Sequence, residues 1–280
     1  MKFKNIFYLF FIIGSLQAQV DGEAEYLIKY EVDFVLDTTN REDVKHEVHR
    51  LYTGSTTSKY ISDGLFYRDS IMQVMRNQPR GNWRAMRGTM ENMPRSEFNA
   101  SVFKDLNNAE IWIQQGLARD QFLYQEPSVP LQWEFTDESK MIEQYMALKA
   151  TTSFGGRDYV AWFTLEVPIL DGPYVFSGLP GLILELYDTE EDYHFNLASI
   201  QPLKENYVID SETRNVKEVS KEEFIQSYKN FRENPTASFS RFIPSNFEYK
   251  DESGRTITRR DIERRAQEEM NKRNNLIEKW

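Results

Sequence analysis

The sequence of 280 residues contains no cysteine and only three histidines. The absence of cysteine excludes disulfides, thiolate nucleophiles, cysteine-ligated zinc and a lipid-modified cysteine near the N-terminus. His46 and His49 lie in a segment that alternates like a strand, where residues three apart point to opposite faces, so their spacing argues against a shared metal. His194 falls on the polar side of another such segment, and we expect it to be exposed.

Sequence motifs of common active sites are also missing. The chain has no G-x-S-x-G, no H-E-x-x-H, no P-loop and no G-x-G-x-x-G before a helix. Carboxylates are plentiful, but a sequence cannot show whether two of them face each other across a cleft. The acidic stretch at 188–192 lacks the spacing of a calcium loop, and we interpret it as a solvated turn. We therefore expect no catalytic residue, no cofactor and no metal ligand.

Long hydrophobic runs are absent beyond the N-terminus. Lys2 and Lys4 precede a short apolar stretch at 6–13, and the small residue Ala18 follows it. This order is typical of a secretory signal peptide at residues 1–18, and the stretch is too short for a membrane-spanning helix. We expect an exported protein, periplasmic or associated with the outer membrane, and soluble after cleavage.

Basic residues are in the minority over most of the chain. The net charge is −10, and it becomes −12 without residues 1–18, which carry two lysines and no acid. This excess of acid disfavours nucleic acid as a partner, because phosphate binding needs a basic face. From residue 255 onward, however, eight Lys and Arg face five Asp and Glu. This basic tail could dock loosely on the acidic body, or serve as a partner-binding arm for peripheral association with anionic lipid headgroups.

Alternation of apolar and polar residues with period two predicts β-strands through most of the chain. It is clearest at 25–37, 159–168, 182–188 and 193–200, with further candidates at 44–53, 58–62, 97–105, 109–115, 120–125 and 131–136. No alternation of strands and helices suggests a parallel sheet. We predict a mainly β protein with an antiparallel domain at 19–215, built on a curved sheet or half-open barrel.

Two helices are predicted after this domain. Ser220 followed by Glu223 forms a capping box, and the helix that it starts ends near residue 234. Thr258 and Asp261 form a second, weaker box, from which a helix is expected to run nearly to the end of the chain. We expect residues 216–280 to be a helical segment that packs on the β domain or extends from it.

A segment rich in methionine and arginine interrupts the strand pattern near 76–96. Five of the nine methionines lie between Met72 and Met93. Met72 and Met75 could form the buried stripe of a short helix, part of an adaptable apolar contact surface, or part of a Cu(I) site. The five arginines and two prolines at 76–96 favour a mobile insertion.

The stretch GPYVFSGLPGLILELYD at 172–188 contains closely spaced glycines and prolines before an apolar run. Phosphate binding would need a helix after the glycines, but a strand follows. We interpret the stretch as a sharp corner that tucks Leu179 inward, either as a structural plug or as the rim of a binding site. The candidate rim or structural residues are Trp162, Phe163, Phe176, Leu179, Pro180, Met72 and Met75.

The flanks of this corner carry a series of specific motifs. They are K-A-T-T at 149–152, G-R at 156–157, A-W-F-T at 161–164, P-x-x-x-G-P at 168–173 and F-x-G-L-P-G-L-I at 176–183. With SKYIS at 58–62 and YRDS at 67–70, they resemble the GLPGLI family, over most of residues 24–200. One departure is Ala147, at a position where relatives often carry cysteine, so no role of that thiol applies here.

The resemblance implies an exported protein of Bacteroidota without an established activity. It also implies a sheet similar to the half-barrel of periplasmic lipoprotein carriers, which is an analogy of fold alone. We expect a non-catalytic envelope protein that binds an apolar ligand, a lipid or lipoprotein, or an envelope partner on a concave sheet. Copper handling through the Met72–Met93 cluster, or an unrecognised hydrolase, is the alternative. A cavity on the concave face, lined by aromatics and without converging acids, would favour the first.

Overall fold

The computed structural model describes residues 21–76, 94–127, 131–210, 216–237, 244, 246–250 and 253–280. The expected signal peptide at 1–18 and residues 77–93 of the methionine- and arginine-rich segment lie outside them.

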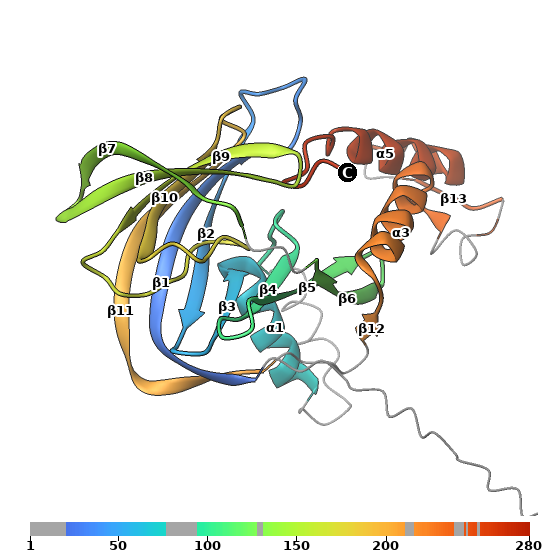
Figure 1. Ribbon diagram of the computed structural model, residues 1–280. Coiled ribbons are helices and arrows are strands. Elements are labelled where there is room, and N and C mark those ends of the chain that lie inside the picture. The colour runs from blue at the N-terminus through green and yellow to red at the C-terminus, as the bar shows by residue number, and fades with distance from the viewer. Residues whose placement is uncertain are drawn as a thin grey trace, which may run out of the picture.

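One large curved sheet dominates the described residues (Figure 1). Its strands are β1 (Gly22–Val35), β2 (Val44–Thr53), β3 (Thr57–Ser62), β4 (Ala100–Asp105), β5 (Glu110–Leu117), β6 (Asp120–Glu126), β7 (Glu134–Ile142), β8 (Tyr145–Phe154), β9 (Arg157–Thr164), β10 (Leu182–Asp188), β11 (Tyr193–Ile209) and β12 (Val216–Glu218).

The twelve strands follow the order β12-β6-β5-β4-β3-β2-β1-β11-β10-β9-β8-β7. Neighbours are antiparallel except for β12, which is parallel to β6. Since β12 and β7 remain as edges, the sheet is curved but does not close into a barrel. The predicted mainly β fold is confirmed, and the likeness to lipoprotein carriers stays an expectation.

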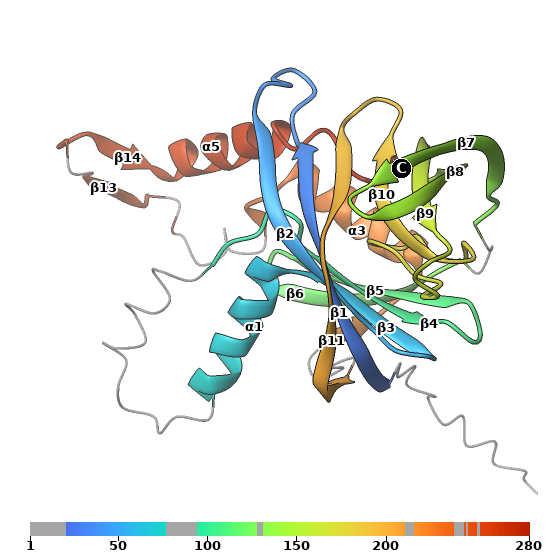
Figure 2. The same cartoon turned by 90° about the vertical axis from the view of Figure 1, so that its left-hand side faces the viewer.

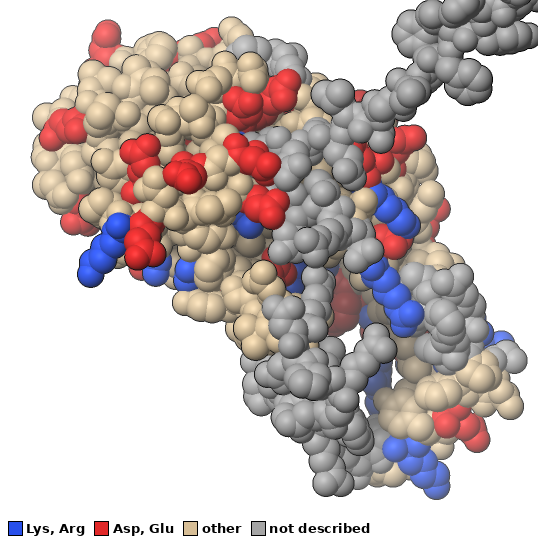
Figure 3. All heavy atoms as spheres, turned by 90° about the horizontal axis from the view of Figure 1, so that it is seen from below, with Lys and Arg blue, Asp and Glu red and all other residues tan. Residues whose placement is uncertain are grey.

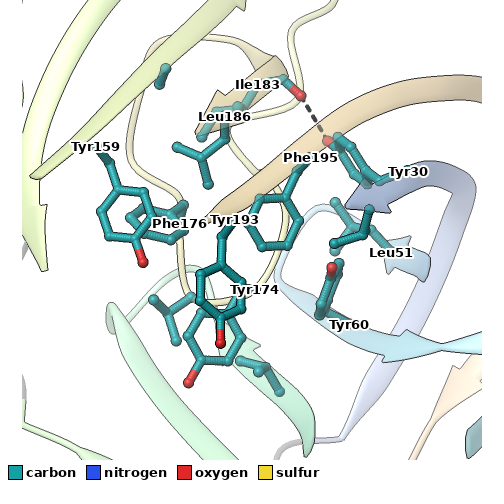
Figure 4. Packing of buried hydrophobic residues seen from close by; sticks show 14 of the residues in the cluster. Tyr30, Leu51, Tyr60, Tyr159, Tyr174, Phe176, Ile183, Leu186, Tyr193 and Phe195 are labelled. Atoms are coloured by element: carbon teal, nitrogen blue, oxygen red, sulfur yellow. Dashed lines mark hydrogen bonds between the residues drawn. The ribbon is translucent and has the colours of Figure 1, made fainter. Parts of the chain in front are cut away.

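The long central strand β1 shows how the sequence pattern forms the core. Ile28, Tyr30, Val32 and Phe34 all point to one side and are buried, as the alternation predicts. Tyr30 donates its hydroxyl hydrogen to the carbonyl oxygen of Ile183 on β10, at 2.7 Å. Figure 4 shows this bond within a core that is rich in tyrosine and phenylalanine.

The hairpin of β7 and β8 differs from the prediction. Strand 131–136 was expected, whereas β7 runs from 134 to 142, and the partner strand β8 was not predicted at all. In β8, the buried Ala147 and Ala150 are three residues apart, which obscures the period of two. The edge strand β7 is exposed along most of its length, so burial imposes no pattern on it.

Strand β9 is shorter than the alternation predicts. It ends at Thr164 rather than at Pro168, and Leu165 is 57% exposed. The reason is that the chain leaves the sheet here to form the segment 165–181, which we call the signature corner. The corner folds back and rejoins the sheet at β10.

Helix α1 (Asp63–Arg76) contacts β2 and β3. Its Phe66 lies 5.9 Å from Tyr52 of β2, between ring centroids, and 4.2 Å from the guanidinium carbon of Arg50. Met72 and Met75 lie on this helix, as one of the three alternatives predicts, but they are half-buried rather than buried. The other three methionines of the cluster lie outside the described residues.

The C-terminal part contains α3 (Lys221–Glu233), α5 (Arg259–Asn271) and the small two-stranded sheet of β13 (Glu248–Lys250) and β14 (Thr256–Thr258). Figure 2 shows α5 and this hairpin extending away from the large sheet. Both predicted capping boxes form, at Ser220 and at Thr258.

The predicted length of the last helix is wrong. Helix α5 ends at Asn271, and residues 275–280, which we call the terminal segment, run along the open end of the sheet. The backbone N–H of Asn275 donates to the oxygen of Leu36, and its side-chain amide donates to the oxygen of Val35, at 3.0 and 2.9 Å. Tyr193 binds the oxygen of Asn275 at 2.7 Å. These contacts with the sheet compete successfully with further helical turns.

Candidate functional site

The signature corner plugs the inside of the curved sheet. Phe176 and Leu179 are fully buried, whereas Pro180 is exposed. Gly181 has a steric requirement: a Cβ atom there would lie 1.9 Å from the oxygen of Thr164, so only glycine fits. The corner therefore brings a compact apolar surface into the core, as the sequence predicts for Leu179.

A buried ion pair holds the corner to the sheet. Lys104 of β4 and Asp171 are both fully buried, and the Lys104 Nζ atom is 2.5 Å from Asp171 Oδ1. The same ammonium donates to the oxygens of Gly172 and Phe176, at 2.8 and 3.4 Å. Burial lowers the pKa of Lys104, and the nearby Asp171 opposes this shift. Its three N–H donors are thus all used within the protein.

A cavity of about 580 Å³ lies beside this anchor. We call it the loop cavity, because its walls come from the signature corner, the β4–β5 turn, the β2–β3 turn and the end of β6. Its apolar lining is mainly aliphatic, with Leu106, Ile111, Ile169, Leu170 and Val175. Lys104 contributes to the lining, with its ammonium held by the corner.

One wall of the loop cavity contains a buried charged network. Glu126 of β6 and Glu278 of the terminal segment both bind Lys221 of α3, at 2.5 and 2.6 Å. Tyr174 donates to Glu278 at 2.7 Å. Burial, assisted by Glu278, raises the pKa of Glu126 to about 7, against the effect of Lys221. Glu126 lines the cavity, so the wall of this mainly apolar space contains a carboxyl group whose pKa is close to neutral pH.

The acidic stretch at 188–192 is an exposed turn at residues 189–191, as predicted, but the prediction is wrong for its two ends. Asp188 and Asp192 are buried, and both accept hydrogen bonds from Arg157, at 2.6 and 3.1 Å. Burial alone would lower the pKa of Arg157, but the two aspartates raise it. With Glu190, these carboxylates have a spacing that could hold a metal ion. The guanidinium of Arg157 supplies a positive charge to the two buried aspartates.

His46 and His49 lie on opposite faces of β2, as the strand geometry predicts, whereas His194, expected to be exposed, is half-buried with its Nε2 atom 3.0 Å from Glu185 Oε1. His46 is exposed and lies 2.6 Å from Asp33, whereas His49 is buried and lies 2.5 Å from the hydroxyl of Tyr60. Burial lowers the pKa of His49, and neighbouring Glu47 opposes this shift. The two rings do not share a site.

The predicted site residues are dispersed. Phe163, Phe176 and Leu179 pack together in the core, and none of the predicted candidates lines the loop cavity. Trp162, the neighbour of Phe163 on β9, lies beneath Lys140, whose Nζ atom is 4.3 Å from the ring centroid. Trp162, Phe163, Phe176 and Leu179 are thus all part of the core, and none of them lines the loop cavity. Pro180 is exposed, and Met72 and Met75 lie on α1.

Sequence reasoning missed Lys104, Glu126, Lys221 and Glu278. A lysine at 104 interrupts the apolar run of β4, and this is the signal that could have identified it. The other three carry no sequence signal, since they meet only when the strands, α3 and the terminal segment assemble.

The basic tail forms ion pairs of its own. On α5, Arg259 binds Glu263, Arg264 binds Asp261, and Lys272 binds Glu269 just beyond the helix. Acidic side chains are spread over the described surface seen from below (Figure 3). Among the described residues, no helix is long and apolar enough to cross a membrane.

A family model described as a protein of unknown function (Porph_ging), of a Bacteroidota-associated family, matches residues 155–185. This stretch begins at the turn before β9, includes the whole signature corner and ends in β10. It supplies Pro168, Ile169, Leu170, Val175, Ser177 and Gly178 to the wall of the loop cavity. No curated protein matches the chain.

Two solved structures of PNGF-II are similar in fold. The one in the C2 space group has a TM-score of 0.50 and 14% identity, over 82% of this chain and 38% of that chain. The one in the P21 space group has a TM-score of 0.47 and 15% identity, over 81% and 36%. This chain therefore spans well under half the length of either. At such identity the likeness concerns the β-rich fold alone.

Proposed function

We propose that this protein is a non-catalytic, exported binding protein of the cell envelope, related to the GLPGLI family. In this proposal the loop cavity holds the acyl chain of a lipid or lipoprotein. The observation that carries the proposal is the position of the cavity: one of its walls is the signature corner, the same segment that the family model matches.

The size and lining of the loop cavity support this function. Pockets for small ligands typically measure roughly 300–1,000 Å³ and are mostly apolar with a few polar groups, and this one measures about 580 Å³. Its apolar part is mainly aliphatic, with Tyr26 and Phe154 as the aromatic members, and this lining suits a flexible chain better than a flat ring. This differs from the aromatic lining expected from the sequence.

The polar groups of the cavity also favour binding over chemistry. The ammonium of Lys104 is fully hydrogen-bonded inside the protein, so it offers no free hydrogen to a substrate. Glu126 is held by Lys221. A carboxyl of pKa about 7 at this position can face the headgroup end of an acyl ligand.

Two leucines of the signature corner provide a matched test. Leu165 and Leu170 are 57% and 58% exposed, but only Leu170 lines the loop cavity. We expect a dansylated undecanoic acid to bind the periplasmically expressed protein in a saturable way. Leu170→Glu should weaken this binding at least tenfold, because it places a charge in the cavity wall, whereas Leu165→Glu should change it less than twofold.

The readout is a fluorescence titration, accompanied by native mass spectrometry of the protein as purified. A co-purifying lipid that is lost in Leu170→Glu and kept in Leu165→Glu supports the proposal. Absence of saturable probe binding, or equal effects of the two substitutions, would refute it.

A further inference from the structure

A second cavity, of about 290 Å³, lies between the open end of the sheet, α3 and the terminal segment. We call it the aromatic cavity. It shares no lining residue with the loop cavity, so it is a separate space. Eight of its lining residues are aromatic and come from distant parts of the chain, among them Phe34, Phe98, Tyr174, Tyr193, Tyr228 and Trp280.

These rings are arranged in pairs that fix one another. Phe34 and Tyr193 are parallel, with ring centroids 6.0 Å apart and an interplanar angle of 3°. Phe98 meets Tyr174 edge-on at 5.5 Å. On the helical side, Tyr228 of α3 contacts Trp280 at 5.1 Å. Pairs of this geometry present both ring faces and ring edges, which are the surfaces that another aromatic ring contacts best.

The charged groups in the lining of the aromatic cavity already have partners. Glu97 forms an ion pair with Arg273. Glu278 binds Lys221 and accepts the hydroxyl hydrogen of Tyr174. A charged ligand would have to break one of these pairs, so the lining favours a neutral molecule.

From this geometry we propose that the aromatic cavity is a second ligand site, selective for a neutral, planar aromatic molecule of one or two fused rings. An apolar cavity of roughly 150 Å³ already accommodates benzene, so about 290 Å³ suffices for a fused pair. The site does not depend on acyl binding in the loop cavity.

The test uses 2-naphthol as the aromatic probe and decanol as the aliphatic comparison, with the whole protein in calorimetric titrations. We expect saturable binding of 2-naphthol with at least tenfold preference over decanol. Ala100, a buried residue that lines the cavity, can be enlarged to fill it. Ala100→Leu should weaken 2-naphthol binding at least tenfold, and Tyr228→Ala, on the half-exposed face of α3, should weaken it several-fold.

Leu170→Glu separates the two sites. It should weaken binding of the dansylated fatty acid at least tenfold and leave 2-naphthol affinity unchanged, whereas Ala100→Leu should do the reverse. If Ala100→Leu does not fold, as judged by circular dichroism, Tyr228→Ala decides. The inference would be overturned if folded Ala100→Leu or Tyr228→Ala bound 2-naphthol as tightly as the wild type. Loss of 2-naphthol binding in Leu170→Glu, or no saturable binding to the wild type, would also overturn it.

Discussion

Replacing Lys104 by methionine should release the signature corner from the sheet. The substitution keeps the length and apolar stem of the side chain but removes the ammonium, which leaves the carboxylate of Asp171 buried without its partner. Removing one partner of a buried ion pair costs about 3–5 kcal/mol. The carbonyl oxygens of Gly172 and Phe176 lose a donor as well.

The expected loss for Lys104→Met is therefore about 3–5 kcal/mol of the free energy of unfolding, out of a total of about 5–15 kcal/mol for a typical domain. Urea unfolding followed by circular dichroism measures it. The control is Lys217→Met, which removes a surface pair with Asp120 in which the two side chains are 57% and 50% exposed. That control should cost less than about 1 kcal/mol.

The double variant Lys104→Met/Asp171→Asn tests the cause. Because it removes the orphaned charge, it should regain at least half of the stability lost in Lys104→Met. A loss below about 1 kcal/mol in the single variant, or a double variant as unstable as the sum of the two single ones, would refute the reasoning.

Three further predictions concern stability and are measured by the same urea titration. Leu179→Ala should cost about 2–5 kcal/mol, because the side chain is fully buried, whereas the exposed neighbour Pro180→Ala should cost less than about 1 kcal/mol. Asn275→Ala should cost about 2–4 kcal/mol, since its buried side-chain amide no longer donates to the oxygen of Val35 or accepts from Arg157, and the exposed neighbour Asn274→Ala should cost clearly less. Folding raises the pKa of Glu126 to about 7, so its protonated form stabilises the fold at low pH and this contribution is lost as the pH rises through 7. The stability of Glu126→Gln relative to the wild type should therefore rise by about 1–3 kcal/mol between pH 5 and pH 8, and a difference independent of pH would contradict the assignment.

Much of the fold follows from local patterns. In β1 the period of two predicts which residues are buried, because the strand has one face on the core and one in solvent. Ser220 and Thr258 start their helices as predicted, because a capping box involves residues only three apart. Strand β8 was missed because its buried alanines do not alternate.

The positions of the predicted site residues were harder to predict than the strands and helix starts. The aromatic residues Trp162, Phe163 and Phe176 were recognised as important by composition, but composition cannot distinguish a core from a cavity wall. The structure puts them in the core, and the apolar lining of the loop cavity comes mainly from aliphatic residues of several turns. Apart from the signature corner, these turns carry no distinctive sequence pattern, and only the curvature of the sheet brings them together with the corner.

By itself, the sequence determined the elements whose physical cause is local: the alternating strands, the two capped helix starts and the corner with its inward Leu179. Tertiary structure decided everything that joins distant residues. Lys104 meets Asp171, Arg157 meets Asp192, and Glu278 meets Glu126 through Lys221. Burial makes such charges costly to leave unpaired, and which partner each one finds depends on how the sheet curves and where the chain crosses it. The same curvature created the two cavities, which no stretch of sequence contains.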